Sequence, residues 1–330
     1  MRKSIMSVCG AAALAGAFAQ TAKAGAWEEY LDPPEAYAEF PREVRFVTRY
    51  ACREFDVELY EQANGPKTRQ RVMMAVPRGL KGRAPCVVVP FYFPEAMLGF
   101  DPKTGSIECP LAPAGTNLTY FSTKFMSDLT RRGYITVSAD AYHRTYCAPK
   151  GDWADWKRAG EALNRDWPGW TGVGKLTFDT RLLVDLAAAD ARVDAGRIGM
   201  IGHSLGGKMA YCAGLTDPRV RAIVASDFGL GWTQTNWNDV WYWGAKLEAA
   251  RSRGLSNADL YVRAGFKPLC LIAGEYDDAD SELILRGATP PEKRGAFRVI
   301  RHGTGHRPPE WAKEESYRFL DSHLKQGAES

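Results

Sequence analysis

Residues 202–206 read Gly202-His203-Ser204-Leu205-Gly206, a Gly-x-Ser-x-Gly stretch. The run 197–201 before it is short and mostly apolar, as in a buried strand, and the run 207–213 after it is typical of a helix. A serine on a tight turn between a strand and a helix has a strained backbone, and glycine on both sides gives the two elements room to approach. We therefore interpret Ser204 as a nucleophile. The alternative is a plain glycine-rich turn.

A nucleophilic serine needs a base and an acid that orients the base, in the chain order serine, acid, histidine. The acid is expected after a later strand, and residues 268–273 form such an apolar run. Asp277 follows this run and is the predicted acid. Asp278 is the alternative, since predicted strand ends carry errors of a few residues. Glu275 is interpreted as a strand-end residue.

The base is expected in a loop between the last strand and a C-terminal helix. Residues 297–300 form the strand, residues 308–324 form the helix, and His306 lies between them after Gly303-Thr304-Gly305. His306 is therefore the predicted base, which takes the proton of Ser204 and returns it to the leaving group. His302 is the rival base, and a solvated loop histidine is the structural alternative.

These three residues in this order resemble the α/β-hydrolase superfamily, over nearly all of the expected mature chain. Within it, the stretch 197–208 resembles the dienelactone hydrolase and acetyl xylan esterase-like branch, and the segments 170–175 and 236–244 add to the resemblance. The resemblance implies an eight-stranded, mostly parallel sheet and an esterase-type activity.

One segment departs from the pattern of that superfamily. Many esterases carry His-Gly-Gly after the third strand, where this chain reads Pro90-Phe91-Tyr92-Phe93-Pro94. The backbone amide of Leu205 is the first expected oxyanion donor. The second is then a backbone amide near Tyr92.

The rest of the chain alternates strands with helices, which predicts an α/β fold with a doubly wound sheet. Two antiparallel edge strands are expected, and the third strand, residues 85–91, is apolar throughout, as a strand buried on both faces should be. The expected strands are 44–62, 71–76, 85–91, 134–139 and 220–225, and the expected helices are 118–132 and 176–192.

Length and composition agree with one large domain over residues 25–330. The chain has 330 residues, of which 45% are hydrophobic, and a formal net charge of +4. Because that charge is small and no dense basic run occurs, nucleic acid is not an expected partner.

The N-terminus is typical of a signal peptide over residues 1–24. Arg2 and Lys3 precede an apolar run, and Ala22-Lys23-Ala24 fits an A-x-A cleavage site. The alternative is an uncleaved membrane anchor. The apolar run is too short and too rich in alanine for a strong anchor. We expect a periplasmic or secreted protein without stable membrane insertion.

Removal of that segment leaves six cysteines. Cys86, Cys212 and Cys270 lie in predicted core elements, where cysteines are mostly inert. Cys109 and Cys147 lie in loops, and an oxidising compartment permits a bridge between them. No cluster has the spacing of a zinc site, so neither a metal nor another cofactor is implied.

Two segments exceed the minimal core, residues 140–174 and 228–244. They hold eight of the ten tryptophans, and both begin at carboxyl ends of strands, where such sheets bind ligands. We expect aromatic walls of a substrate cleft, with Trp170 or Trp237 facing the substrate. The alternative is that these rings pack on one another as a lid core.

The sequence thus predicts a secreted serine esterase that acts on small-molecule or polysaccharide esters, with carbohydrate esters favoured by the tryptophans. A peptidase or amidase of the prolyl-oligopeptidase type is the second hypothesis. That class normally carries a large N-terminal propeller, whereas about twenty residues precede the first strand here. A non-catalytic binding module is the third, and the intact set of serine, acid and histidine argues against it.

Overall fold

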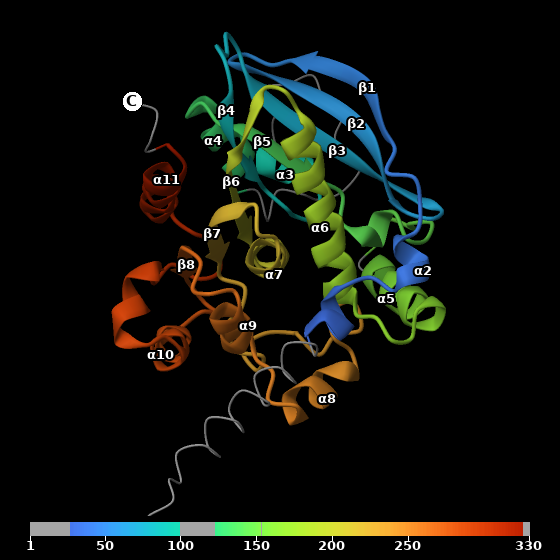
Figure 1. Cartoon of the computed structure of the whole chain (residues 1–330), viewed down its shortest axis with the longest axis vertical. Helices are drawn as coiled ribbons and strands as arrows, with labels where there is room; N and C mark the ends of the chain where they lie inside the picture. Colours follow the sequence, from blue (N-terminus) through green and yellow to red (C-terminus); the bar gives the residue numbers. More distant parts are fainter. Residues whose placement is uncertain (1–26, 100–122, 153, 326–330) are drawn as a thin grey trace, which may run out of the picture.

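The computed structural model describes residues 27–99, 123–152 and 154–325. Within these ranges the strands form one nine-stranded sheet in the order β1-β2-β3-β5-β4-β6-β7-β8-β9 (Figure 1). The strands are β1 Val44–Ala51, β2 Phe55–Gly65, β3 Thr68–Pro77, β4 Ala84–Val88, β5 Ile135–Ala139, β6 Val193–His203, β7 Val220–Ser226, β8 Leu269–Ala273 and β9 Phe297–Arg301.

The sheet is parallel from β5 to β9 and antiparallel from β1 through β3 to β5. The chain passes from β4 to its neighbour β5 and then returns to the other side of β4 with β6, so the strand order reverses there. At such a reversal, loops leaving the carboxyl ends of the strands diverge and open a crevice. The predicted α/β fold with a mostly parallel sheet is confirmed.

The sheet has nine strands where eight were expected. The run 44–62, expected as one edge strand, is two strands that fold back on each other at residues 52–54, so that Val44 pairs with Gln62. The reversal at residues 52–54 contains no glycine or proline, so the sequence carries no strong turn signal there. The other expected strands are present, with ends shifted by a few residues.

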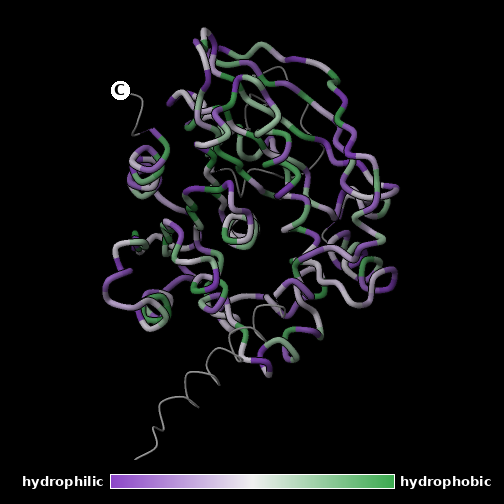
Figure 2. The backbone as a smooth tube through the Cα atoms, in the orientation of Figure 1, coloured by the Kyte–Doolittle hydropathy of each residue, from purple (hydrophilic) through white to green (hydrophobic). Residues whose placement is uncertain are grey.

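Helices cover both faces of the sheet. Helices α6 and α7 pack on one face, and α4 and α11 pack on the other (Figure 1). Along β4, Cys86 and Val88 join the first apolar cluster and Val87 joins the second, as the two-residue period of a strand requires. Apolar segments accordingly concentrate in the central strands (Figure 2). The helices are α2 Glu35–Ala38, α3 Pro94–Leu98, α4 Phe125–Arg131, η2 Tyr142–Arg144, α5 Ala154–Asp166, α6 Gly172–Ala189, α7 Leu205–Thr216, α8 Lys246–Ser252, α9 Asn257–Arg263, α10 Ala279–Ala288, η3 Pro291–Ala296 and α11 Glu310–Leu324.

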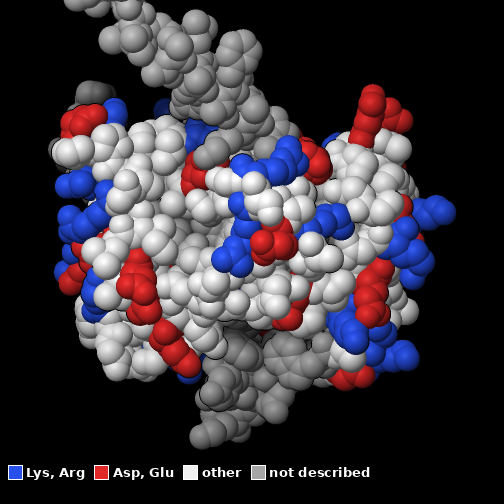
Figure 3. All heavy atoms as spheres, turned by 90° about the horizontal axis from the view of Figure 1, so that it is seen from below, with Lys and Arg blue, Asp and Glu red and all other residues white. Residues whose placement is uncertain are grey.

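The expected signal peptide lies outside the described residues. In the part of the chain that the structure describes, no helix has both the length and the apolar character needed to cross a bilayer. On the face shown in Figure 3, lysine and arginine side chains are interspersed with aspartate and glutamate.

The two long segments have their own structure. Residues 140–174 hold η2, α5 and the first turn of α6, and residues 228–244 form consecutive turns. Trp27, near the start of the described chain, packs edge-on against Trp232 and Trp243, with ring centroids 6.2 and 5.9 Å apart. Its indole nitrogen donates to Asp259 at 2.9 Å. The N-terminal segment is therefore part of the aromatic core beneath the turns.

Two glycines allow the turn between β6 and α7 to be tight. A Cβ at Gly202 would lie 2.0 Å from the carbonyl oxygen of Gly206. A Cβ at Gly206 would lie 2.1 Å from the carbonyl oxygen of Pro90, in the loop after β4. Since both obstacles are backbone atoms, the lack of a side chain at Gly206 lets the start of α7 approach Pro90 and Phe91.

Substitution of Gly206 by alanine is expected to lower the free energy of unfolding by about 1–3 kcal/mol, because the added methyl overpacks against backbone. Gly287, near the end of α10, is the matched control, since a Cβ there meets nothing within 4 Å. Gly287→Ala should leave stability unchanged or raise it by up to about 1 kcal/mol. Urea unfolding of both variants measures the difference. Equal stability of Gly206→Ala and the wild type would contradict the close approach.

Candidate active site

Ser204 stands alone between the end of β6 and the start of α7. Its backbone is left-handed, with φ 55° and ψ −117°, which is a strained conformation for a residue other than glycine. Its amide donates to the carbonyl of Ser226, at the end of β7, at 2.8 Å. The turn predicted from the sequence is therefore the turn that the chain makes.

His306 lies in the loop between β9 and α11, as predicted. Its Nδ1 donates to the carboxylate Oδ2 of Asp227 at 2.6 Å, and its ring is held between His203 and Tyr276, with centroids 4.4 and 4.7 Å away. Because His203 directly precedes Ser204, this packing sets the imidazole beside the elbow. The side chain of His306 remains 19% exposed, so one edge of the ring stays open to solvent.

The acid that contacts His306 is Asp227, and the predicted hydrogen bond to Asp277 is wrong. Asp227 directly follows β7, and its side chain is fully buried. Besides His306, it accepts hydrogen bonds from the four amides of residues 274–277, at 2.9 to 3.1 Å. Burial alone would raise the pKa of Asp227, but the bonds from His306 and these amides hold it below its ordinary value.

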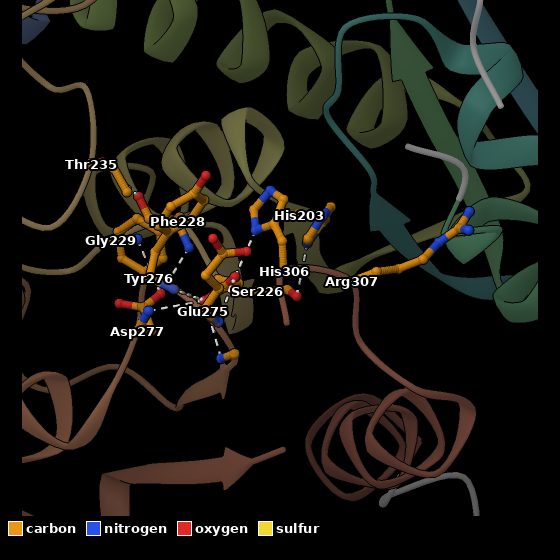
Figure 4. Close-up of polar contacts among 12 residues, drawn as sticks. His203, Ser226, Phe228, Gly229, Thr235, Glu275, Tyr276, Asp277, His306 and Arg307 are labelled. Carbon is orange, nitrogen blue, oxygen red and sulfur yellow. Dashed lines mark hydrogen bonds and ion pairs between the residues drawn. The ribbon is translucent and has the colours of Figure 1, made fainter. Parts of the chain in front are cut away.

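Asp277 points away from His306. Its buried carboxylate accepts from the amides of residues 228–230, and Figure 4 shows it on the side of Phe228 and Gly229. Asp278, the alternative, is exposed and caps α10 through the amide of Asp280. Glu275 is exposed.

A signal for Asp227 was present in the sequence. It stands at the carboxyl end of the strand that follows the elbow, and it preserves the order serine, acid, histidine.

The rival base, His302, is buried and pairs its Nδ1 with the hydroxyl of Thr304 at 2.9 Å. Burial also lowers the pKa of His302.

The segment expected to supply the second oxyanion donor lies beside the elbow. Leu205 is the first residue of α7, so its amide has no acceptor within the helix. Pro90 and Phe91 approach the first turn of α7 at Gly206, and Tyr92 is the next residue of that segment. The carbonyl of Tyr92 in turn accepts from the amide of Ala141 at 3.2 Å.

An ion-pair cluster anchors the segment of residues 90–95 to β3 and to the end of β5. Arg71 of β3 makes paired hydrogen bonds with the buried Glu95 of α3 and with Asp140 after β5, at 2.5 to 3.1 Å. The two carboxylates outweigh the effect of burial and raise the pKa of Arg71. In place of a glycine-rich turn, the chain thus holds residues 90–95 by charge pairing.

Comparison with known proteins bears on the fold of the chain. Residues 114–236 match the model of the dienelactone hydrolase family. Three solved structures are similar over most of their length: a glucuronoyl esterase from Solibacter usitatus (15% identity, TM-score 0.65, 90% of this chain and 90% of that one), a glucuronoyl esterase from Teredinibacter turnerae (15%, 0.67, 92% and 83%) and an acetyl xylan esterase from Paenibacillus sp. R4 (14%, 0.56, 87% and 90%). No curated protein matches the chain by sequence.

The chain has the α/β-hydrolase fold. The predicted resemblance to the dienelactone hydrolase and acetyl xylan esterase-like branch is confirmed, and so is the predicted enzyme class, a serine hydrolase. Over the described residues of this hydrolase, no group of histidine, cysteine, aspartate or glutamate side chains is arranged to hold a metal ion.

The two tryptophans expected to face the substrate are buried. Trp170 is 1% exposed and packs against Tyr37 and Phe178. Trp237 is 0% exposed and donates its indole N–H to the carbonyl of Gly229 at 2.7 Å. Neither ring offers a face to a sugar in this structure, so the alternative of a lid core holds for both. Both rings belong to the apolar cluster that also covers one face of the central sheet, so the two segments contribute them to the main core.

Lys208 is a site residue that the sequence reasoning missed. It lies one turn after Ser204 on α7, and its amine is buried among the lid residues. The amine donates to the hydroxyl of Thr235 at 3.1 Å and lies 4.7 and 4.8 Å from the ring centroids of Trp237 and Tyr242. Burial lowers the pKa of Lys208 to about 7. The spacing of four residues from the serine was the available signal.

The bonding of the cysteines departs from the expected bridge between Cys109 and Cys147. Cys147 is free, so the bridge between Cys109 and Cys147 is not formed. Cys52 is disulfide-bonded. Cys86, Cys212 and Cys270 are buried and free, as expected for core residues.

The buried amine makes a prediction about stability and pH. Lys208 has a pKa of about 7 in the folded chain, against about 10.4 for an unfolded lysine. Between these values the unfolded chain binds a proton that the folded chain does not, so this group makes stability rise with pH, by about 1 kcal/mol per pH unit. In Lys208→Met that contribution is lost. Urea unfolding of both proteins at pH 7.5 and 9 measures it, and parallel pH slopes would contradict the buried, neutral amine.

Proposed function

We propose that this hydrolase cleaves carboxylic esters through Ser204, His306 and Asp227, with carbohydrate esters as its substrates, in the periplasm or outside the cell. The observation that carries the catalytic part is the hydrogen bond of 2.6 Å between His306 Nδ1 and Asp227, beside a serine in strained left-handed geometry. A base oriented by a buried carboxylate next to such a serine is the arrangement that acyl transfer requires.

The proposed reaction has two halves. The Ser204 oxygen attacks the ester carbonyl while the second ring nitrogen of His306, Nε2, takes its proton, and Asp227 stabilises the imidazolium that forms. The oxyanion is held by the amides of Leu205 and Tyr92, and each such donor contributes about 3 kcal/mol in comparable sites. The alcohol leaves with the proton from His306. Water, deprotonated by the same ring, then releases the acyl group from Ser204.

The substrate class is supported by the structural neighbours. Those relatives are esterases of acetylated xylan and of glucuronoyl groups, and they cover most of this chain. The buried state of Trp170 and Trp237 removes the earlier support from indole platforms. Half-buried residues around the elbow, such as Tyr92 and Tyr276, are the candidates for discriminating among carbohydrate esters.

Export is supported by two features of the chain. Residues 1–24 have the composition of a signal peptide, and Cys52 is held in a disulfide. Disulfides persist in oxidising compartments and are rare in the cytosol.

The test of activity uses the purified mature protein with a panel of acetylated, feruloylated and uronoyl methyl-ester carbohydrates, p-nitrophenyl acetate and a proline anilide. We expect turnover of the aryl ester and of at least one carbohydrate ester, and none of the anilide. Ser204→Ala should abolish this turnover while leaving the unfolding midpoint nearly unchanged, and a serine-directed phosphonate should label Ser204 alone. Label on another serine would refute the nucleophile, and turnover of the anilide alone would favour the peptidase.

The identity of the acid is tested by Asp227→Asn. The imidazole then loses the carboxylate that orients it and stabilises its charge, so kcat should fall by about 10³- to 10⁴-fold. Asp278→Asn is the matched control, because that carboxylate is exposed and accepts from Asp280 and Gln234 instead of the imidazole, and it should lose less than about threefold. Steady-state kinetics on p-nitrophenyl acetate gives both values. A larger loss from the control would place the acid on the loop after β8.

A further inference from the structure

The loops after β7 and β8 bind each other through two buried aspartates. The carboxylate of Asp227, from the first loop, accepts the four amides of residues 274–277 in the second. The carboxylate of Asp277, from the second loop, accepts the three amides of residues 228–230 in the first, at 2.7 to 3.1 Å. Each side chain therefore holds the backbone that follows the other strand, an arrangement we call the reciprocal clasp (Figure 4).

The clasp closes directly on the residue that orients the histidine. The amide of Asp277 itself donates to Asp227 Oδ1 at 2.9 Å, while Oδ2 of the same carboxylate accepts from His306. On its other side, Asp227 is followed at once by Phe228, whose amide is bound by Asp277. Asp277 therefore holds Asp227 in two ways: its amide binds the Asp227 side chain, and its carboxylate binds the amide of Phe228.

Asp227 needs such support because its backbone is strained. Its φ of 44° lies in the left-handed region, which a residue with a side chain occupies only when its surroundings impose it. The amide of Asp227 is bound to the carbonyl of Ile272 at 2.8 Å, which fixes the side toward β7. The amides of residues 228–230 fix the side toward the lid, and all three are bound by Asp277.

We infer that Asp277 is a positioning residue of the proposed reaction: it holds Asp227 against His306 through the reciprocal clasp and does not itself touch the imidazole. The expected loss of turnover rests on the proposed function. The expected displacement of Asp227 and His306 rests on the geometry alone. A carboxylate suits the task because its two oxygens accept several amides at once, and bonds to a charged acceptor are about twice as strong as neutral ones.

The test compares Asp277→Asn with Asp278→Asn, its exposed neighbour. The amide side chain keeps the shape but offers one acceptor oxygen to three backbone donors, so the loop after β7 should shift. Displacement of a positioning group by about 1 Å costs up to about 100-fold in rate. We therefore expect kcat on p-nitrophenyl acetate to fall about 10- to 100-fold, with KM within about threefold of the wild type, and the control to stay within about threefold in both.

A double-variant cycle separates positioning from a general loss of structure. If Asp277 acts through Asp227, then Asp277→Asn should cost less than about threefold in kcat when Asp227 is already asparagine. The same 10- to 100-fold loss in both backgrounds would show another route and overturn the inference.

A proton resonance gives a readout that needs no turnover. The Nδ1 proton of His306, bound to a carboxylate, should give a downfield proton NMR signal that disappears in Asp227→Asn. We expect it to move or broaden in Asp277→Asn and to stay in place in Asp278→Asn. An unchanged signal in Asp277→Asn would overturn the inference. If the wild type shows this signal but no turnover that depends on Ser204, the proposed function fails and the clasp stands.

A milder variant covers the case in which Asp277→Asn does not fold. Ser281 donates its hydroxyl to Asp277 Oδ1 at 2.9 Å and accepts from Gln234 Nε2 at 3.0 Å. Ser281→Ala therefore removes one of the four hydrogen bonds to the Asp277 carboxylate, together with the contact to Gln234, without adding a charge or a clash. It should displace the same resonance by a smaller amount and lower kcat about two- to fivefold. A folded Ser281→Ala protein with wild-type kcat and an unmoved signal would then count against the clasp.

Discussion

The buried carboxylate of Asp227 joins three loops of the molecule. It belongs to the loop after β7, it accepts four amides from the loop after β8, and it receives the imidazole from the loop after β9. A charge inside a protein is tolerated only where hydrogen bonds replace its lost hydration. The five donors around Asp227 meet that condition, and in meeting it they fix the positions of the three loops relative to Ser204.

Much of this arrangement was predictable, because its signals are local. The elbow depends on glycines next to the serine, and the place of His306 depends on a strand and a helix that are adjacent in the chain. The acid was not predictable in the same way. Asp227 and Asp277 both follow parallel strands, and both satisfy the order serine, acid, histidine. Only the contacts between loops that are fifty residues apart in sequence distinguish them.

The tryptophans show a second limit of sequence reasoning. Their number singled out two segments that form helices and turns over residues 140–152, 154–174 and 228–244. The sequence could not say whether the rings face a ligand or one another, because an indole suits both environments. Lys208 was overlooked for the converse reason: lysine is rarely fully buried, and nothing in the sequence shows that the turns of the second segment close over it.

The packing of Trp27 against Trp232 and Trp243 bears on the order in which the chain folds. Trp27 is separated from the other two rings by more than two hundred residues, so bringing it to them costs more chain entropy than pairing neighbouring strands does. The sheet forms mostly from strands nearer in sequence. We therefore expect the aromatic core beneath the turns of residues 228–244 to form after the sheet has brought the N-terminal segment close to the loop that follows β7.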